Sequence, residues 1–139
     1  WFGQGARAAV ERARAQVAAL VGATPAEIVF TSGGTEADNL ALRGAAAAAP
    51  AARRKIVVSA IEHPAVLNTA KALAQEGFEV AVVPVDGAGR LDLEALRDQV
   101  DEPTAPVSPM LANNEPGVPQ PVVEAAALAA RVDPARTIA

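Results

Sequence analysis

The chain has 139 residues, a formal net charge of −4 and an apolar fraction of 51%. Its basic residues are scattered apart from Arg53, Arg54 and Lys55, which argues against a nucleic-acid-binding surface, because phosphate-backbone binding needs a basic face. The sequence has no cysteine and one histidine, so it offers neither a disulfide framework nor a metal cluster. It also has no apolar run long enough to span a bilayer and no signal-peptide pattern, so we expect a cytoplasmic protein without membrane contact.

Helices and short apolar strands are predicted to alternate along the chain. A short capped turn is expected over 24–27, and Pro109 predicts that the last strand lies at an edge of the sheet or is irregular. Strands separated by helices pair in parallel, so we predict an α/β fold with three α/β/α layers and a mostly parallel sheet. The predicted helices are 10–21, 35–49, 64–76, 92–100 and 121–132, and the predicted strands are 28–30, 55–60, 78–83 and 106–111.

Polar side chains follow three of the four predicted strands. They lie at 32–35 after the first strand, at 62–63 after the second and at 113–115 after the fourth, whereas the third is followed by a turn of Asp86 and glycines. In parallel sheets ligands bind outside the carboxyl ends of the strands. We therefore expect Thr35, His63 and Asn114 to gather around one pocket at this edge.

Residues 31–42 have the pattern of a strand, a glycine turn and the start of a helix. The first N–H groups of a helix carry partial positive charge and lack intrahelical acceptors, so a phosphate fits there. Gly33 and Gly34 permit a tight turn and a close approach, and Thr35 adds a hydroxyl donor. The alternative is an ordinary capping pair of Thr35 with Asp38, and this segment alone does not decide between the two interpretations.

His63 and Asn114 each have a functional and a structural interpretation. Pro64 favours an extended backbone at His63, which lets the imidazole project from the strand end to accept a proton or lie against a flat ligand. A helix cap or an idle surface histidine is the alternative. The carboxamide of Asn114 suits a phenolic or carbonyl oxygen, but Asn-Asn-Glu-Pro-Gly is also ordinary turn sequence.

Three motifs occur in this order along the chain: residues 30–40 (FTSGGTEADNL), 61–67 (IEHPAVL) and 113–121 (NNEPGVPQP). Together they resemble the cysteine desulfurases, which supply sulphur for iron-sulphur clusters and thiolated tRNA, and the resemblance runs from about Gly3 to about Leu128. These enzymes are pyridoxal-phosphate enzymes of the class V aminotransferase type. The resemblance implies that residues 1–139 are a partial cofactor-binding large domain of fold type I, truncated at both ends and without the small C-terminal domain.

The resemblance also implies a role for each matching residue. Gly34 and Thr35 would hold the phosphate of pyridoxal 5'-phosphate, which agrees with the anion-site interpretation. His63 would stack on the pyridine ring and transfer protons. Asn114 would hydrogen-bond the phenolic oxygen of the cofactor, with Glu115 and Gln120 supporting the loop.

The activity implied is removal of sulphur from L-cysteine, which gives L-alanine and an enzyme persulphide. A homodimer and a scaffold protein that accepts the sulphur are the implied partners. The chain has no match for the family's covalently bound lysine, its Ser-x-His phosphate loop or its persulphide-forming cysteine. Neither Lys55 nor Lys71 stands at the position of the family's lysine, and the sequence contains no cysteine. We therefore expect residues 1–139 alone to show no turnover.

Some alternatives remain open at this point. Asp133 follows Val132 as in the family segment whose aspartate pairs with the pyridine nitrogen, but Arg131 stands where that segment has histidine, and the spacing from Asn114 is short. The function could also be that of another class V enzyme such as a selenocysteine lyase. A non-catalytic α/β remnant is the third interpretation, and it predicts no stabilisation by phosphate or pyridoxal phosphate.

Overall fold

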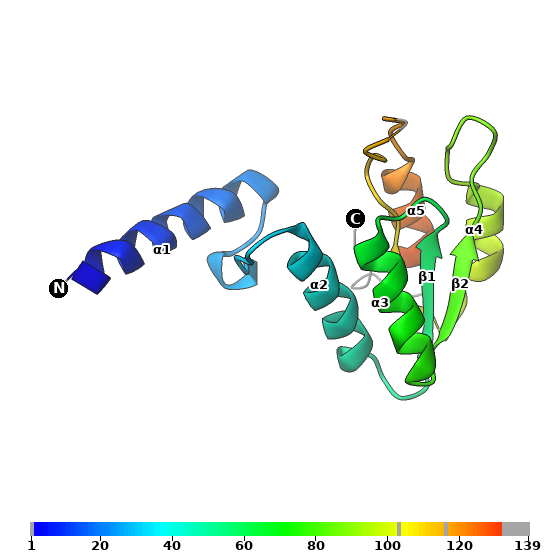
Figure 1. Ribbon diagram of the computed structural model, residues 1–139, viewed down its shortest axis with the longest axis horizontal. Helices are drawn as coiled ribbons and strands as arrows, with labels where there is room; N and C mark the ends of the chain where they lie inside the picture. The colour runs from blue at the N-terminus through cyan, green and yellow to red at the C-terminus, as the bar shows by residue number, and fades with distance from the viewer. Residues whose placement is uncertain (1, 103, 116, 132–139) are drawn as a thin grey trace. The chain divides into compact units, whose positions relative to one another are not determined.

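The computed structural model describes residues 2–102, 104–115 and 117–131 (Figure 1). The chain divides into two compact units, residues 1–34 and residues 35–139. The predicted Asp133 and the end of the helix predicted over 121–132 lie outside the described residues. None of the described helices is long and apolar enough to cross a membrane.

The first unit holds helix α1 (Phe2–Val21) and the short 3-10 helix η1 (Pro25–Glu27). Helix α1 begins earlier than predicted and ends as predicted at Gly22, whose φ of 70° suits glycine. The predicted capped turn is confirmed, because the Glu27 carboxylate accepts hydrogen bonds from the backbone N–H and the hydroxyl of Thr24, both at 2.7 Å.

The prediction of a strand over 28–30 is wrong. Ile28 has an extended backbone (φ −94°, ψ 125°), but this segment pairs with no other part of the described chain. A strand needs a neighbour to satisfy its backbone groups, and the carbonyl of Ile28 is instead bound by the Arg14 guanidinium. That guanidinium also lies 5.1 Å from the centre of the Phe30 ring.

The second unit is built on a parallel three-stranded sheet in the order β2-β1-β3. Helix α2 starts at Gly34, on the boundary between the units. The strands alternate with helices as predicted, and the α/β fold class is confirmed. In chain order the elements are α2 (Gly34–Ala48), β1 (Lys55–Ser59), α3 (Pro64–Gln75), β2 (Glu79–Val83), α4 (Leu93–Gln99), β3 (Thr104–Ser108) and α5 (Val122–Ala130).

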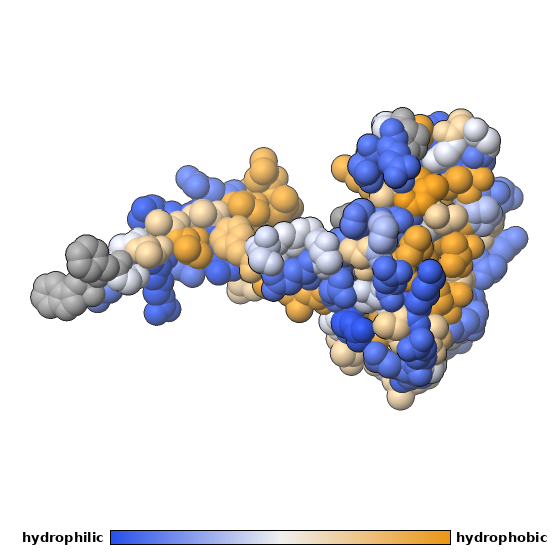
Figure 2. Space-filling view, viewed as in Figure 1, coloured by the Kyte–Doolittle hydropathy of each residue, from blue (hydrophilic) through white to orange (hydrophobic). Residues whose placement is uncertain are grey.

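Helices α2 and α3 cover one face of this sheet, and α4 and α5 cover the other (Figure 1). Successive residues of a strand point to opposite faces, so Ile56 and Val58 of β1 pack on α2 and α3 while Val57 packs on α4 and α5. All five residues of β1 are buried, as expected for a central parallel strand. Figure 2 shows that apolar and hydrophilic residues are mixed on the surface of this unit. The exposed apolar side chains of this unit include Val82, Leu111 and Val123.

Strand β3 (Thr104–Ser108) begins before its predicted range of 106–111 and also ends before it. Pro109 follows directly and has no N–H to donate to a strand ladder, which explains the earlier end. Among the described residues strand β3 pairs only with β1, and the register between them shifts between Lys55 and Val57. The edge position and irregularity predicted from Pro109 are both present.

Candidate functional site

Thr35 lies in the first turn of α2, directly after the helix starts at Gly34. No hydrogen bond joins Thr35 to Asp38 in the described part of the chain, so the alternative capping pair is not formed. The Thr35 side chain is exposed and its hydroxyl has no hydrogen-bond partner among the described residues. Neither Gly33 nor Gly34 has a positive φ, so the predicted tight turn does not require glycine there; a Cβ at either would meet nothing within 4 Å.

His63 caps the amino end of α3. Its backbone is extended (φ −59°, ψ 147°), as expected before Pro64, and its Nδ1 accepts a hydrogen bond from the N–H of Ala65 at 3.1 Å. The structure thus forms the cap that was the alternative to a functional role. The cap occupies only Nδ1, so the exposed ring and its Nε2 stay available to a ligand.

Asn114 lies at the tip of the loop that follows β3. Its neighbour Asn113 donates from Nδ2 to the carbonyl of Ile61 at 2.8 Å and accepts from the N–H of Glu115 at 2.8 Å. The exposed carboxamide of Asn114 forms no hydrogen bond with any residue the structure describes. The turn interpretation therefore fits Asn113, and the amide of Asn114 is left for a ligand.

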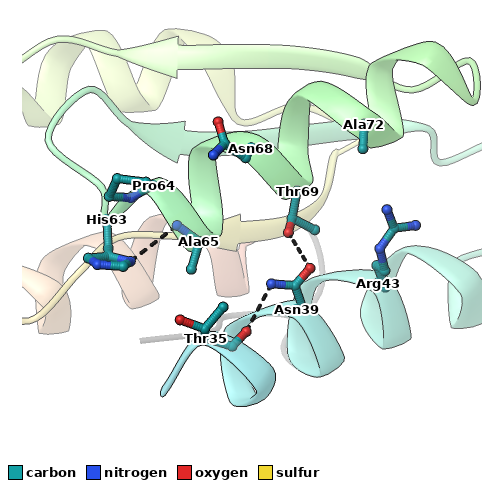
Figure 3. A pocket seen from close by; sticks show the side chains of 9 residues that line it. All are labelled: Thr35, Asn39, Arg43, His63, Pro64, Ala65, Asn68, Thr69 and Ala72. Atoms are coloured by element: carbon teal, nitrogen blue, oxygen red, sulfur yellow. Dashed lines mark hydrogen bonds between the residues drawn. The ribbon is translucent and has the colours of Figure 1, made fainter. Parts of the chain in front are cut away.

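His63 links the pockets around these residues. Thr35 and His63 line a pocket of about 400 Å³ between α2 and α3 (Figure 3). His63 and Asn114 line a second pocket of about 620 Å³, which shares Pro64 with the first. The expected single pocket is thus two pockets that meet at the imidazole.

A chain of hydrogen bonds crosses the first pocket. The Thr69 hydroxyl on α3 donates to Oδ1 of Asn39 at 2.6 Å, and Nδ2 of Asn39 donates to the carbonyl of Thr35 at 2.9 Å (Figure 3). Sequence reasoning missed Asn39 and Thr69. The available signal was the position of Asn39 one helical turn after Thr35, on the same face of α2.

Glu62 is buried beside His63, with 7% of its surface exposed. Its Oε1 accepts hydrogen bonds from the Ser59 hydroxyl and the Met110 N–H, both at 2.6 Å. Burial raises the pKa of Glu62, with a smaller upward contribution from the Asp38 carboxylate, and this outweighs the lowering effect of the two hydrogen bonds. The sequence drew attention to Glu62 as a neighbour of His63, but its links to Ser59 and Met110 were not predicted.

Gln120 supports the loop of Asn114 through its side-chain hydrogen bonds, as the resemblance implied. Its Oε1 accepts from the N–H of Leu91 at 2.8 Å, and its Nε2 donates to the carbonyls of Gly89 and Val118 at 2.9 and 3.0 Å. The loop after β2 is a turn, as predicted, in which Oδ1 of Asp86 accepts two backbone N–H groups. Glu115 takes part in the loop through its backbone N–H alone in the described structure.

Both lysines lie away from this edge of the sheet. Lys55 is at the amino end of β1, the opposite end of the strand from His63, and its Nζ pairs with Asp101 Oδ2 at 2.9 Å. Lys71 is exposed on α3 and does not line either pocket. Residues 2–102, 104–115 and 117–131 contain no group of acidic or histidine side chains that could hold a metal ion.

Comparison with known proteins gives consistent matches over most of the chain. Residues 2–137 match the family model described as Aminotransferase class-V. Human cysteine desulfurase is 43% identical over 123 residues, which are 88% of this chain and 27% of the human protein. The chain therefore spans less than a third of the length of this curated relative.

Solved structures show the same fold. A structure titled NifS-like protein superposes with a TM-score of 0.90 at 41% identity, over 99% of this chain and 38% of that chain. The structure titled SspA in complex with cysteine gives a TM-score of 0.84 at 32% identity, over 94% of this chain and 38% of that chain. The α/β arrangement is thus shared with larger proteins of this type.

Proposed function

Because the chain belongs to the class-V aminotransferase family, we propose that it forms part of the pyridoxal-phosphate-binding domain of a cysteine desulfurase. The reaction would remove sulphur from L-cysteine and leave L-alanine, with the sulphur held as a persulphide on an enzyme cysteine. The similarity to human cysteine desulfurase and to a protein solved with cysteine supports this substrate. A homodimer, a sulphur-accepting scaffold protein and a cytoplasmic location belong to the same proposal.

One observation carries the proposal. Thr35, His63 and Asn114 line two pockets that meet at the imidazole, and each keeps a polar group that no described residue engages. A phosphorylated pyridine requires an anion site, a flat contact and a hydrogen-bond donor for its phenolic oxygen. The side chains present fit that set, since they supply a hydroxyl, an imidazole face and a carboxamide.

The phosphate would lie at the amino end of α2. The partial positive charge of a helix N-terminus favours an anion there, and the Thr35 hydroxyl adds a donor from the second residue of the helix. Gly34 has open space at its Cα, so a ligand can approach the backbone. The hydrogen bond from Asn39 to the Thr35 carbonyl fixes this turn from the other side.

His63 would bind the pyridine ring against its imidazole and move a proton. Since Nδ1 accepts the Ala65 N–H, Nε2 is the atom that can take or give that proton while the cap stays intact. The cap also fixes the plane of the ring relative to α3. Asn114 would donate from its amide to the phenolic oxygen, and pyridoxal phosphate when bound supplies the electron sink for bond cleavage in the amino acid.

Titration of the full-length gene product with pyridoxal 5'-phosphate tests the binding site. Thr35→Val should weaken pyridoxal phosphate by about tenfold or more, because it removes a hydrogen bond to a charged group, and should leave the affinity for unphosphorylated pyridoxal nearly unchanged. His63→Ala and Asn114→Ala should weaken both ligands. Equal losses of both ligands in Thr35→Val would contradict the phosphate assignment.

Alanine release from L-cysteine tests the reaction. The full-length gene product loaded with cofactor should form alanine from cysteine, whereas residues 1–139 alone should not, since Lys55 and Lys71 lie away from the site. Turnover of selenocysteine with none of cysteine would favour the lyase alternative. Absence of thermal stabilisation by pyridoxal phosphate would favour the non-catalytic one.

A further inference from the structure

Two reciprocal hydrogen bonds join the loops that carry His63 and Asn114. From the loop after β1, the Glu62 carboxylate accepts the N–H of Met110 at 2.6 Å. From the loop after β3, the Asn113 amide donates to the carbonyl of Ile61 at 2.8 Å. Each bond comes from the residue directly before a predicted cofactor contact. We call this pair the Glu62/Asn113 link.

The Met110 N–H needs a partner because of the sequence around it. The strand pairing of β1 with β3 ends at Val58 and Ser108, and Pro109 has no N–H. Met110 is therefore the first donor after the strand. Glu62 reaches it from the neighbouring loop with a carboxylate that is held at its own strand end by the Ser59 hydroxyl.

Asn113 uses both ends of its amide. Oδ1 accepts the N–H of Glu115 and shapes the turn, while Nδ2 donates to the carbonyl of Ile61 in the other loop and to Met110 Sδ, at 3.5 Å, in its own loop. In the described part of the chain, no other hydrogen bond joins the 60–63 loop to the 109–115 loop. The distance between the two loops beyond the sheet thus depends on the Glu62/Asn113 link.

We propose that Glu62 and Asn113 are positioning residues, which hold His63 and Asn114 at the spacing that the pyridine ring of pyridoxal phosphate requires. The inference rests on the proposed function. The pocket of about 620 Å³ that His63 and Asn114 share is also lined by Ile61 and Glu62, so a change in loop spacing alters its width directly. A ring held between an imidazole and a carboxamide loses affinity when either is displaced.

Four substitutions distinguish the effect of the Glu62/Asn113 link from the effect of charge and from the effect of the turn that Asn113 forms. Glu62→Gln removes the charge but keeps one oxygen, which can accept both hydrogen bonds, because both fall on Oε1. Glu62→Asp keeps the charge but is too short to reach both donors. Asn113→Asp removes the donor to Ile61 and keeps an acceptor for the turn. Gln75→Glu, on an exposed position of α3, is the control for added negative charge.

The experiment measures pyridoxal phosphate and pyridoxal affinity, and the visible circular dichroism of the bound cofactor, in the full-length gene product. Glu62→Asp and Asn113→Asp should weaken both ligands by about tenfold and change the dichroism, as expected for loss of one hydrogen bond that orients the site. Both ligands should be affected, because the link acts on the ring contacts and not on the phosphate. Glu62→Gln and Gln75→Glu should stay within about twofold of the unsubstituted protein.

The outcomes are distinct. Asn113→Asp and Glu62→Asp with unchanged affinity and dichroism would overturn the inference while the proposed function stands. A loss of affinity in Glu62→Gln with none in Glu62→Asp would overturn it too, since it would show that the charge and not the link matters. If Glu62→Asp does not fold, Asn113→Asp decides alone. An unsubstituted protein that binds no pyridoxal phosphate would refute the proposed function and the inference together.

Discussion

The Thr69 hydroxyl donates a hydrogen bond of 2.6 Å to Oδ1 of Asn39, and this bond joins α3 to α2 inside the pocket that Thr35 and His63 line (Figure 3). Only 4% of the Thr69 surface is exposed. Nδ2 of Asn39 in turn donates a hydrogen bond to the carbonyl of Thr35. The spacing of the two helices is therefore set at this point by polar groups as well as by the apolar core below.

Thr69→Val should lower the free energy of unfolding by about 1–2 kcal/mol, because valine has a similar shape but leaves Oδ1 of Asn39 without its donor. Thr69→Ser, which keeps the hydroxyl, should retain more of this stability. Asn68→Ala, at the exposed neighbouring position, should change stability by less than about 0.5 kcal/mol. Chemical denaturation of the cofactor-free protein measures all three, and a Thr69→Val variant as stable as Asn68→Ala would contradict the role of this bond.

Glu62 combines burial with two short hydrogen bonds, and its pKa is raised above the ordinary value of 4.5 mainly by burial. The nearby Asp38 carboxylate raises the pKa further. A raised pKa means that the folded state binds the proton more tightly than the unfolded state. The contribution to stability is therefore fully present below 4.5 and is lost as the pH rises through the folded-state pKa.

Glu62→Gln should remove this loss, because an amide does not ionise and keeps an acceptor for Ser59 and Met110. Relative to the unsubstituted protein, the variant should gain stability as the pH rises from 4.5 toward neutral. Denaturation midpoints measured across that range give the difference directly. Parallel curves for the two proteins would show that the Glu62 carboxylate does not titrate in this interval.

The sequence was sufficient to predict the alternation of helices and parallel strands, because hydrophobic periodicity and proline and glycine positions are local signals. Helix α3 begins at Pro64 as expected, and the turn at Asp86 forms as expected. The strand predicted over 28–30 failed for a physical reason. An apolar run becomes a strand only when it pairs with another strand, and residues 28–30 pair with none in the described chain.

The sequence predicted which residues form the candidate site, but it did not predict the contacts that hold them in place. His63 and Asn114 follow adjacent strands, so the topology alone brings their loops to one edge of the sheet. The bonds of Asn39 to Thr69 and of Glu62 to Met110 join residues far apart in the sequence. No local pattern reports such a pairing, because it depends on how the helices and loops pack.

Lys55 is the buried lysine of the described structure, and its environment predicts a structural role. Its Nζ pairs with Asp101 at 2.9 Å and lies 3.6 Å from Glu79. Burial acts to raise the pKa of Asp101, but hydrogen bonds from Lys55 and from the Thr104 hydroxyl outweigh it and lower the pKa. A lowered pKa gives stability that is present above the ordinary value of 3.8 and is lost as the pH falls through the folded-state value.

Asp101→Ala should therefore destabilise the protein at neutral pH, by about 1–2 kcal/mol rather than the larger cost of a fully buried pair, because Asp101 is about half exposed. The difference from the unsubstituted protein should shrink in acid, where Asp101 is protonated anyway. Pyridoxal phosphate affinity should not change, and borohydride reduction of the loaded protein should leave no pyridoxyl group on Lys55. A label on Lys55 would contradict its structural role.

Gln120 is a buried polar residue that supports the Asn114 loop, with 6% of its surface exposed. Its carboxamide binds the 89–91 turn through both ends and also binds Val118, so it attaches the base of the Asn114 loop to the turn that follows β2. Because the donors and the acceptor are all used, no similar side chain can replace glutamine without losing a bond.

Gln120→Glu should destabilise the protein by about 2 kcal/mol or more, since it removes two donors and places a charge in a buried site, while it keeps the acceptor for Leu91. Gln75→Glu, the same change at an exposed position, should stay within about 0.5 kcal/mol of the unsubstituted protein. Amide hydrogen exchange should be faster in the 111–119 loop of Gln120→Glu, because the loss of the donor to the Gly89 carbonyl weakens the attachment of the loop to the turn. Equal exchange in the two variants would show that the Glu62/Asn113 link is sufficient to hold the Asn114 loop without Gln120.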